Sequence, residues 1–199
     1  MQAHPDTRCT AFAGSRRIAA GELRHVALKA QQASHAGEHP LIFDDRSSQL
    51  IDLDLRGSPA DLLRRLADAP ATLGAEPAAA MAPVRKGPGR PKLGVVAREV
   101  TLLPRHWQWL AAQPGGASVA LRKLVEDARR QHAGSDRRRA AQEAAYRFMA
   151  AMAGNERGFE EATRALFAGD AAAFEERIAA WPDDVRDHAA LLAAEALRD

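Results

Sequence analysis

The stretch LIFDDRSSQLIDLDLRGSPADLLRRL, residues 41–66, indicates most directly which fold class the chain adopts. Its first residues, 41–43, are a compact apolar run that predicts a strand, and a polar turn follows over 44–48. Isoleucine and leucine then alternate with aspartate over 51–55, a pattern typical of a half-buried strand. This part of the chain is therefore expected to contribute two neighbouring strands.

Helix signals lie on either side of these strands. Residues 58–61, Ser-Pro-Ala-Asp, combine an N-cap serine, a first-turn proline and a carboxylate, which together predict a helix start. Upstream, residues 8–14 predict a strand, and residues 18–36 predict a helix with one apolar face. We therefore expect an α+β protein whose residues 1–68 form a small β-α-β-β-α domain. A core of that size is marginal alone, so this domain should pack on another part of the molecule.

The middle of the chain divides into two segments. Residues 69–93 collect proline and glycine without apolar periodicity, which predicts a flexible basic linker. Residues 94–132 predict a strand over 95–103, a helix opened by Pro104, and a second helix capped by Ser118. The second helix is expected to bury an apolar stripe, which consists of Leu121, Leu124, Val125 and Ala128.

Residues 133–199 are predicted to be an acidic, all-helical region. Asp136 is expected to cap one helix, and a second should begin near Phe159 and stop at a glycine. Asp170 should cap a third helix and Pro182 should open a fourth.

Charge is strongly segregated along the chain. Residues 85–139 hold 13 basic and 4 acidic side chains, a net charge of +9. Residues 140–199 hold 6 basic and 12 acidic side chains, a net charge of −6, whereas residues 1–84 are nearly balanced at 9 and 10. A +9 block indicates a polyanionic partner, most simply nucleic acid. The alternative is that the basic block folds against the acidic part of the same chain.

Several classes of protein are excluded by composition. A single cysteine, Cys9, rules out a disulfide scaffold or a multi-cysteine metal site, and its place on a predicted strand indicates that it is packed. No catalytic motif is present, so we expect a non-enzymatic protein without a cofactor or metal. The first residues, MQAHPDTR, do not resemble a signal peptide, and no apolar stretch is long enough to span a bilayer. We expect a cytoplasmic protein with no membrane partner.

Three sequence blocks point to a known family. They are TAFAG (10–14) with RIA (17–19), LIFDD (41–45) with IDLDLRG (51–57), and GRPKLGVVAREVTLLPRHW (89–107) continued by QPGGAS (113–118). In these blocks the chain resembles an uncharacterised bacterial family, domain of unknown function 2239 (DUF2239). The resemblance covers nearly the whole sequence and is most specific in its central block. The resemblance implies membership of the family, but it carries over no activity and no site residue.

Residues 95–131 also resemble a ribbon-helix-helix module, which implies an obligate dimer whose paired strands lie in the DNA major groove. Arg98 and Thr101 are then the candidates for base contacts. Successive residues of a strand point to opposite faces, so Arg98 and Thr101 cannot both enter the groove. If Val100 and Leu102 point toward the protein, the DNA groove contacts Thr101 and a glutamate. If the strand is turned over, the groove contacts Arg98 together with Val100 and Leu102. The alternative is that this strand completes the N-terminal sheet.

Residues 89–92, Gly-Arg-Pro-Lys, resemble the core of an AT-hook, an extended element that lies in the DNA minor groove. Proline replaces the first arginine of that pattern, so only Arg90 matches, and the alternative is a solvated basic linker. Arg85, Lys86 and Lys92 would add phosphate contacts. Further phosphate contacts are assigned to Arg122, Lys123, Arg129, Arg130, Arg137, Arg138 and Arg139.

Taken from the sequence, the leading hypothesis is a non-enzymatic, homodimeric DNA-binding protein, for example a regulator, that contacts DNA through residues 85–139. The alternative hypothesis is a protein–protein adaptor that does not bind nucleic acid.

Overall fold

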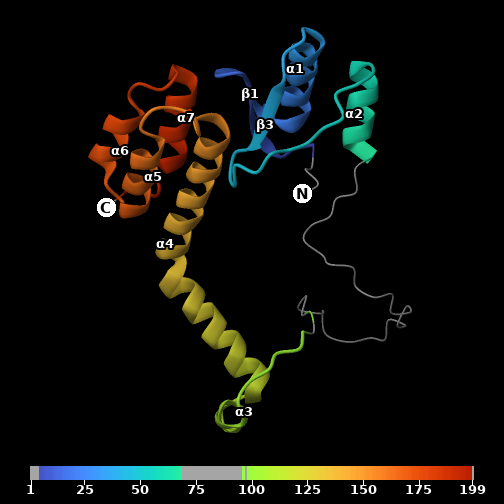
Figure 1. Cartoon of the computed structure of the whole chain (residues 1–199). Helices are drawn as coiled ribbons and strands as arrows, with labels where there is room; N and C mark the ends of the chain where they lie inside the picture. Colours follow the sequence, from blue (N-terminus) through green and yellow to red (C-terminus); the bar gives the residue numbers. More distant parts are fainter. Residues whose placement is uncertain (1–4, 69–95, 97, 199) are drawn as a thin grey trace. The chain divides into compact units, whose positions relative to one another are not determined.

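The computed structural model describes residues 5–68, 96 and 98–198, and it confirms an α+β fold (Figure 1). The N-terminal part contains a three-stranded antiparallel sheet and two helices, and the C-terminal part is helical. In chain order the elements are β1 (Arg8–Ala13), β2 (Arg16–Glu22), α1 (Leu23–His35), β3 (Pro40–Asp44), α2 (Pro59–Asp68), α3 (Pro104–Ala111), α4 (Gly116–Met152), α5 (Phe159–Ala168), α6 (Ala171–Ile178) and α7 (Asp183–Ala193).

The sheet has the order β2-β1-β3, with β1 in the centre. The prediction of a helix over 18–36 is wrong in its first part, because 16–22 pair with β1 as a hairpin. Gly14, at φ +56°, makes the turn between β1 and β2. Helix α1 begins only at Leu23, and Leu23, Val26, Ala27 and Ala30 are buried on its inner face. The predicted β-α-β-β-α order is therefore observed as β-β-α-β-α.

Residues 51–55 do not form the predicted strand, although their burial alternates as expected. Only an isolated bridge between Phe43 and Leu50 joins this region to β3. Side chains, rather than a neighbouring strand, donate hydrogen bonds to backbone carbonyls of residues 51–55. Arg65 donates to the carbonyl of Asp54 at 2.7 Å, and Gln31 donates to the carbonyl of Leu55 at 2.9 Å. These bonds replace part of a strand ladder, so the segment needs no further strand partner on that side.

Helix α2 starts as its sequence predicts. The Ser58 hydroxyl accepts a hydrogen bond from the Asp61 backbone N–H at 3.2 Å, and the Asp61 carboxylate accepts from the Ser58 backbone N–H at 3.2 Å. This reciprocal pair is a capping box. The same contacts with Ser58 hold the pKa of Asp61 below its usual value.

The end of α5 and the start of α6 lie where the sequence predicts, whereas the helix start predicted within α4 is absent. The Asp170 side chain accepts a hydrogen bond from the Ala173 backbone N–H at 3.0 Å and caps α6, and Gly169 at φ +76° terminates α5. Trp181 lies just beyond α6 rather than within it. The predicted helix start at Asp136 is wrong, because α4 runs without a break from Gly116 to Met152. Asp136 pairs with Arg139 on the helix surface at 2.7 Å and does not cap it.

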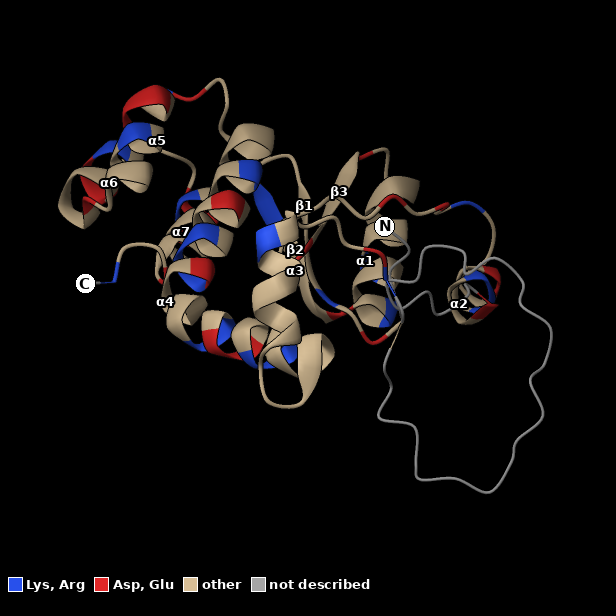
Figure 2. Cartoon of the chain, turned by 90° about the horizontal axis from the view of Figure 1, so that it is seen from below, with Lys and Arg blue, Asp and Glu red and all other residues tan. Residues whose placement is uncertain are grey.

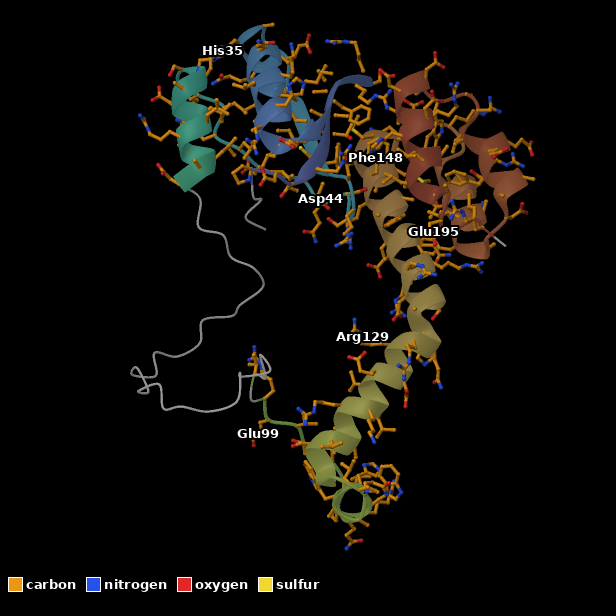
Figure 3. All side chains as sticks on the ribbon, turned by 180° about the vertical axis from the view of Figure 1, so that it is seen from behind. His35, Asp44, Glu99, Arg129, Phe148 and Glu195 are labelled. Carbon is orange, nitrogen blue, oxygen red and sulfur yellow. The ribbon has the colours of Figure 1, made fainter. Side chains whose placement is uncertain are left out.

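One hydrophobic core joins the N-terminal strands to the C-terminal helices. Phe12 of β1 and Phe43 of β3 each pack against Phe148 of α4, with ring centroids 5.2 Å apart in both pairs. In Figure 3, Phe148 lies on the side of α4 that faces the strands. A second cluster, which includes Cys9, fills the space between the sheet, α1 and α2. The small N-terminal sheet thus packs on the helices as its size requires.

The chain divides into two compact units, whose boundary falls within α4 between residues 133 and 134. The first unit takes its described residues from 1–73 and 134–199, and the second takes them from 74–133. In the part of the chain that the structure describes, no helix is both long enough and apolar enough to cross a membrane.

Candidate nucleic-acid interface

The described part of the second unit consists of an extended segment followed by two helices. Residues 96 and 98–103 precede α3, and a turn over 112–115 connects α3 to α4. The predicted strand over 95–103 is absent from these described residues. Strands require a partner for their backbone N–H and C=O groups, and a single copy of this segment offers none.

Two helices alone leave much of the apolar surface of this unit uncovered. Within it, Leu110 and Ala120 are buried, whereas the predicted buried stripe of α4 is not. Leu124 is 47% exposed and Val125 is 54% exposed. The prediction of a buried stripe is therefore wrong for the single chain, because α3 has only eight residues and covers one end of α4.

The exposed apolar residues surround a shallow hollow of about 280 Å³ between α3 and α4. Its lining consists of Leu102, His106, Trp109, Leu110, Leu121 and Leu124. Trp109 is 53% exposed at its edge. An apolar patch of this kind on a small helical unit is typical of an interaction surface.

The basic side chains that α4 contributes to the second unit lie apart from the apolar stripe of the same helix. At 3.6 residues per turn, an arc of about 120° contains Arg122, Lys123, Arg129 and Arg130 together with Glu126. The apolar residues Leu121, Leu124, Val125 and Ala128 fall outside this arc, with Val125 next to its edge. We call these four residues the cationic face. Figure 2 shows basic segments along α4 with acidic segments between them, and Figure 3 shows Arg129 extending from the helix.

Carboxylates of α4 pair with part of the cationic face without burying it. Arg129 lies 3.0 Å from Glu126, and Arg130 pairs with Asp127. The two arginine side chains remain 73% and 74% exposed. Exposed pairs of this kind contribute about 0–1 kcal/mol and are screened by salt, so a phosphate can displace the carboxylate.

Arg137, Arg138 and Arg139 belong to the first unit and have different partners. Arg137 lies 3.5 Å from Glu195, Arg138 donates to the backbone carbonyl of Arg198, and Arg139 pairs with Asp136. In Figure 3, Glu195 lies close to α4. The basic block therefore contacts the acidic C-terminal part at this one point, and the three arginine side chains remain exposed.

The remaining predicted contacts are separated from the cationic face in different ways. Arg98 and Thr101 are exposed on the extended segment before α3. Arg85, Lys86, Arg90 and Lys92, together with the predicted linker over 69–93, lie outside the described residues. Sequence reasoning did not single out Arg105, which is exposed on α3 and adds a further cation to this unit.

The aspartates near β3 serve the local structure. Asp44 is buried and accepts hydrogen bonds from the Ser47 backbone N–H at 2.8 Å and from the Ser47 hydroxyl at 2.7 Å. Asp54 pairs with Arg56 at 2.8 Å, and hydrogen bonds from Arg56 lower the pKa of Asp54 to about 2. Within the described ranges, no three metal-ligating side chains gather closely enough to hold an ion.

The model of one known protein family matches most of the chain. A family model described as an uncharacterized protein conserved in bacteria (DUF2239) matches residues 8–193. The chain belongs to the DUF2239 family. The match runs from β1 to the last residue of α7, so it includes both units of this DUF2239 protein. Neither the curated proteins nor the solved structures contain a match to it.

Proposed function

We propose that this DUF2239 protein is a non-enzymatic DNA-binding protein that acts as a homodimer and contacts the DNA backbone through the cationic face of α4. The observation that carries the proposal is the division of α4 into two faces. Four exposed basic side chains lie on one face, and an exposed apolar stripe lies on another. A helix with this pattern suits a protein that pairs with a second copy and presents positive charge to a polyanion.

Dimerisation would account for the apolar residues that the single chain leaves exposed. Trp109, Leu124 and Val125 would be buried by a second copy, which would offer the same surface in return. Residues 95–103 would then pair with the same residues of the partner, as the ribbon-helix-helix resemblance implies. That pairing would supply the backbone partners that one copy lacks, and it would turn either Thr101 or Arg98 toward the bases, depending on which face of the strand lies in the groove.

The cationic face provides affinity and little sequence preference. Each phosphate neutralised by lysine or arginine releases condensed counterions, so the logarithm of affinity falls with the logarithm of salt by about 0.9 per contact. Four contacts per protomer make eight in the homodimer, which predict a contribution of about 7 to that slope. Arg85, Lys86, Arg90 and Lys92 would add to it, and Arg90 would favour a narrow, A·T-rich minor groove.

The test is a fluorescence-anisotropy titration of short duplex DNA with the full chain over a series of salt concentrations. The test variant replaces Arg122, Lys123, Arg129 and Arg130 by glutamine. The matched control replaces Arg24, Arg64, Arg164 and Arg177 by glutamine, which makes the same change in net charge at exposed sites elsewhere. We expect the test variant to lose about 7 from the salt slope of the homodimer and the control to retain the wild-type slope. Absence of binding at low salt, or equal losses in both variants, would refute the proposal.

The second candidate is a protein–protein adaptor, which the ion pair between Arg137 and Glu195 and the exposed apolar stripe favour. The same titration separates the two candidates, because an adaptor is indifferent to DNA at every salt concentration. Both candidate functions use the exposed apolar stripe as an interaction surface. Sedimentation of the Leu124→Glu variant tests whether that stripe forms the dimer interface. A charge on the apolar stripe is expected to yield a monomer if that stripe is the dimer interface.

A further inference from the structure

A hollow of about 550 Å³ lies within the first unit, where the sheet meets α4 and α7. It is distinct from the cationic face and lies in the other unit. One wall is formed by small and apolar side chains, including alanines of α4 together with Leu191 and Leu192 of α7. Its volume is within the range of small-molecule sites, which are concave, mostly apolar and supplied with a few polar groups.

A buried histidine with an unsatisfied nitrogen lines this hollow. His188 of α7 is 3% exposed, and its ring packs against Phe148 at 4.6 Å and Phe12 at 5.4 Å between centroids. Among the described residues, nothing forms a hydrogen bond with its buried Nδ1 atom. An unpaired buried polar atom costs about 1–3 kcal/mol, so an occupant that bonds to it would stabilise the site.

Four arginines also line the hollow, and two of them have unengaged side chains. Arg17 and Arg46 make no side-chain ion pair or hydrogen bond within the part of the chain that is described. Arg8 lies 3.9 Å from Asp45, at the outer limit of an ion pair, and Arg137 lies 3.5 Å from Glu195.

The hollow therefore carries a local excess of positive charge. Burial lowers the pKa of His188, Asp45 opposes that effect and Arg17 adds to it, so the imidazole is neutral at physiological pH. The four guanidinium groups that line the hollow exceed its two lining carboxylates by two charges. The carboxylates of Asp184 and Asp44, which accept from the backbone N–H groups of Arg17 and Arg46, offset part of that excess. Guanidinium groups offer pairs of N–H donors that match the oxygens of a phosphate.

We propose that this hollow binds a small organic phosphate, with the phosphate at Arg17 and Arg46 and an apolar body against α4 and α7. A phosphate monoester offers more oxygen acceptors and more negative charge to the two unengaged guanidinium groups than a carboxylate does, which favours the phosphate. Nδ1 of His188 is closed to solvent in the single chain, so a hydrogen bond from the ligand to it would require the imidazole ring to shift. The site does not depend on the proposed DNA contacts. It also gives Arg137, which the sequence assigned to DNA, a role in holding one side of the hollow through Glu195.

The test is calorimetric titration of the full chain with phenyl phosphate, which combines a dianion with an apolar ring. Benzoate, phenol and inorganic phosphate are titrated alongside it. We expect saturable binding of phenyl phosphate at one site per chain, with weaker binding of each of the other three. Absence of saturable phenyl phosphate binding, or binding of phenol or benzoate at least as tight, would overturn the proposal.

Variants locate the site. Arg17→Gln combined with Arg46→Gln is expected to raise the dissociation constant of phenyl phosphate by about tenfold or more, because two charge-assisted contacts are lost. The matched control, Arg64→Gln combined with Arg164→Gln, removes two exposed arginines that pair with neighbouring carboxylates and should leave the constant unchanged. Leu191→Trp adds bulk at a position that is 67% exposed and should abolish binding without unfolding the protein. Unchanged binding in both site variants would place the ligand elsewhere and refute the assignment.

Discussion

Replacing Phe148 by alanine measures how strongly the N-terminal strands depend on the C-terminal helices. The Phe148 side chain is fully buried, and its ring lies 5.2 Å from the rings of Phe12 and Phe43 and 4.6 Å from that of His188. Removal of a buried phenylalanine destabilises a protein by about 3–5 kcal/mol. Because three aromatic contacts are lost together, we expect the upper part of that range for the free energy of unfolding. Phe148→Leu keeps most of the volume and should lose about 1–2 kcal/mol.

Two probes follow urea unfolding of this variant, one in the core that contains Phe148 and one in the second cluster. Trp181 is buried beside the C-terminal helices, and its fluorescence reports on them once Trp107 and Trp109 are replaced by phenylalanine. Cys9 is buried in β1, and its reaction with a thiol reagent reports opening of the sheet. If the two clusters unfold as one cooperative unit, Phe148→Ala shifts both midpoints together. A shift in the tryptophan signal while Cys9 stays protected as in the wild type would show that the sheet is stable by itself, contrary to our reasoning.

Three further predictions concern protonation and backbone conformation. Burial holds the pKa of His188 below its ordinary 6.5, so the folded state resists protonation and the free energy of unfolding should fall as the pH drops below 6.5. Urea titrations should show this loss of stability in the wild type and not in His188→Phe. Burial raises the pKa of Cys9 to about 12, so iodoacetamide should label it only at the rate of unfolding, as mass spectrometry can follow. Gly169→Ala should destabilise the protein by about 1 kcal/mol because the φ of Gly169 is +76°. Gly134→Ala should stabilise the protein by about as much, because Gly134 lies within α4 with open space around it. Equal shifts of the melting temperature in the two variants would contradict this reasoning.

Local chemistry was readable from the sequence wherever neighbouring residues decide the structure. Ser58 and Asp61 satisfy each other across one helical turn, so the start of α2 follows from four residues. Gly169 and Asp170 end one helix and cap the next for equally local reasons. The family membership was also recognisable, because its sequence blocks extend over most of the chain.

Features that depend on distant partners were predicted wrongly or missed. Residues 18–22 carry an apolar pattern that suits a helix, but pairing with β1 makes them a strand. Asp136 has the chemistry of a cap, yet α4 continues through it. His188 lies beside Ala189 in the apolar pattern of α7, and a histidine on such a face was the available signal that this helix borders a polar hollow. Arg122, Lys123, Arg129 and Arg130, to which the sequence assigns phosphate contacts, are exposed, and their binding to DNA stays a prediction.

The shared aromatic core has a consequence for how the protein is made. Phe12 and Phe43 leave the ribosome long before the residues of α7, which complete the same core. At a translation rate of about 5–20 residues per second, the 153 residues between Phe43 and Ala196 take roughly 8–30 s to synthesise. During that interval α1 and α2 can cover one part of the sheet, but Phe12 and Phe43 lack the C-terminal helices that bury them in the finished protein. Chaperone dependence of this protein should therefore concentrate on its first fifty residues, and a stop codon placed before α7 should yield an aggregating chain rather than a smaller stable one.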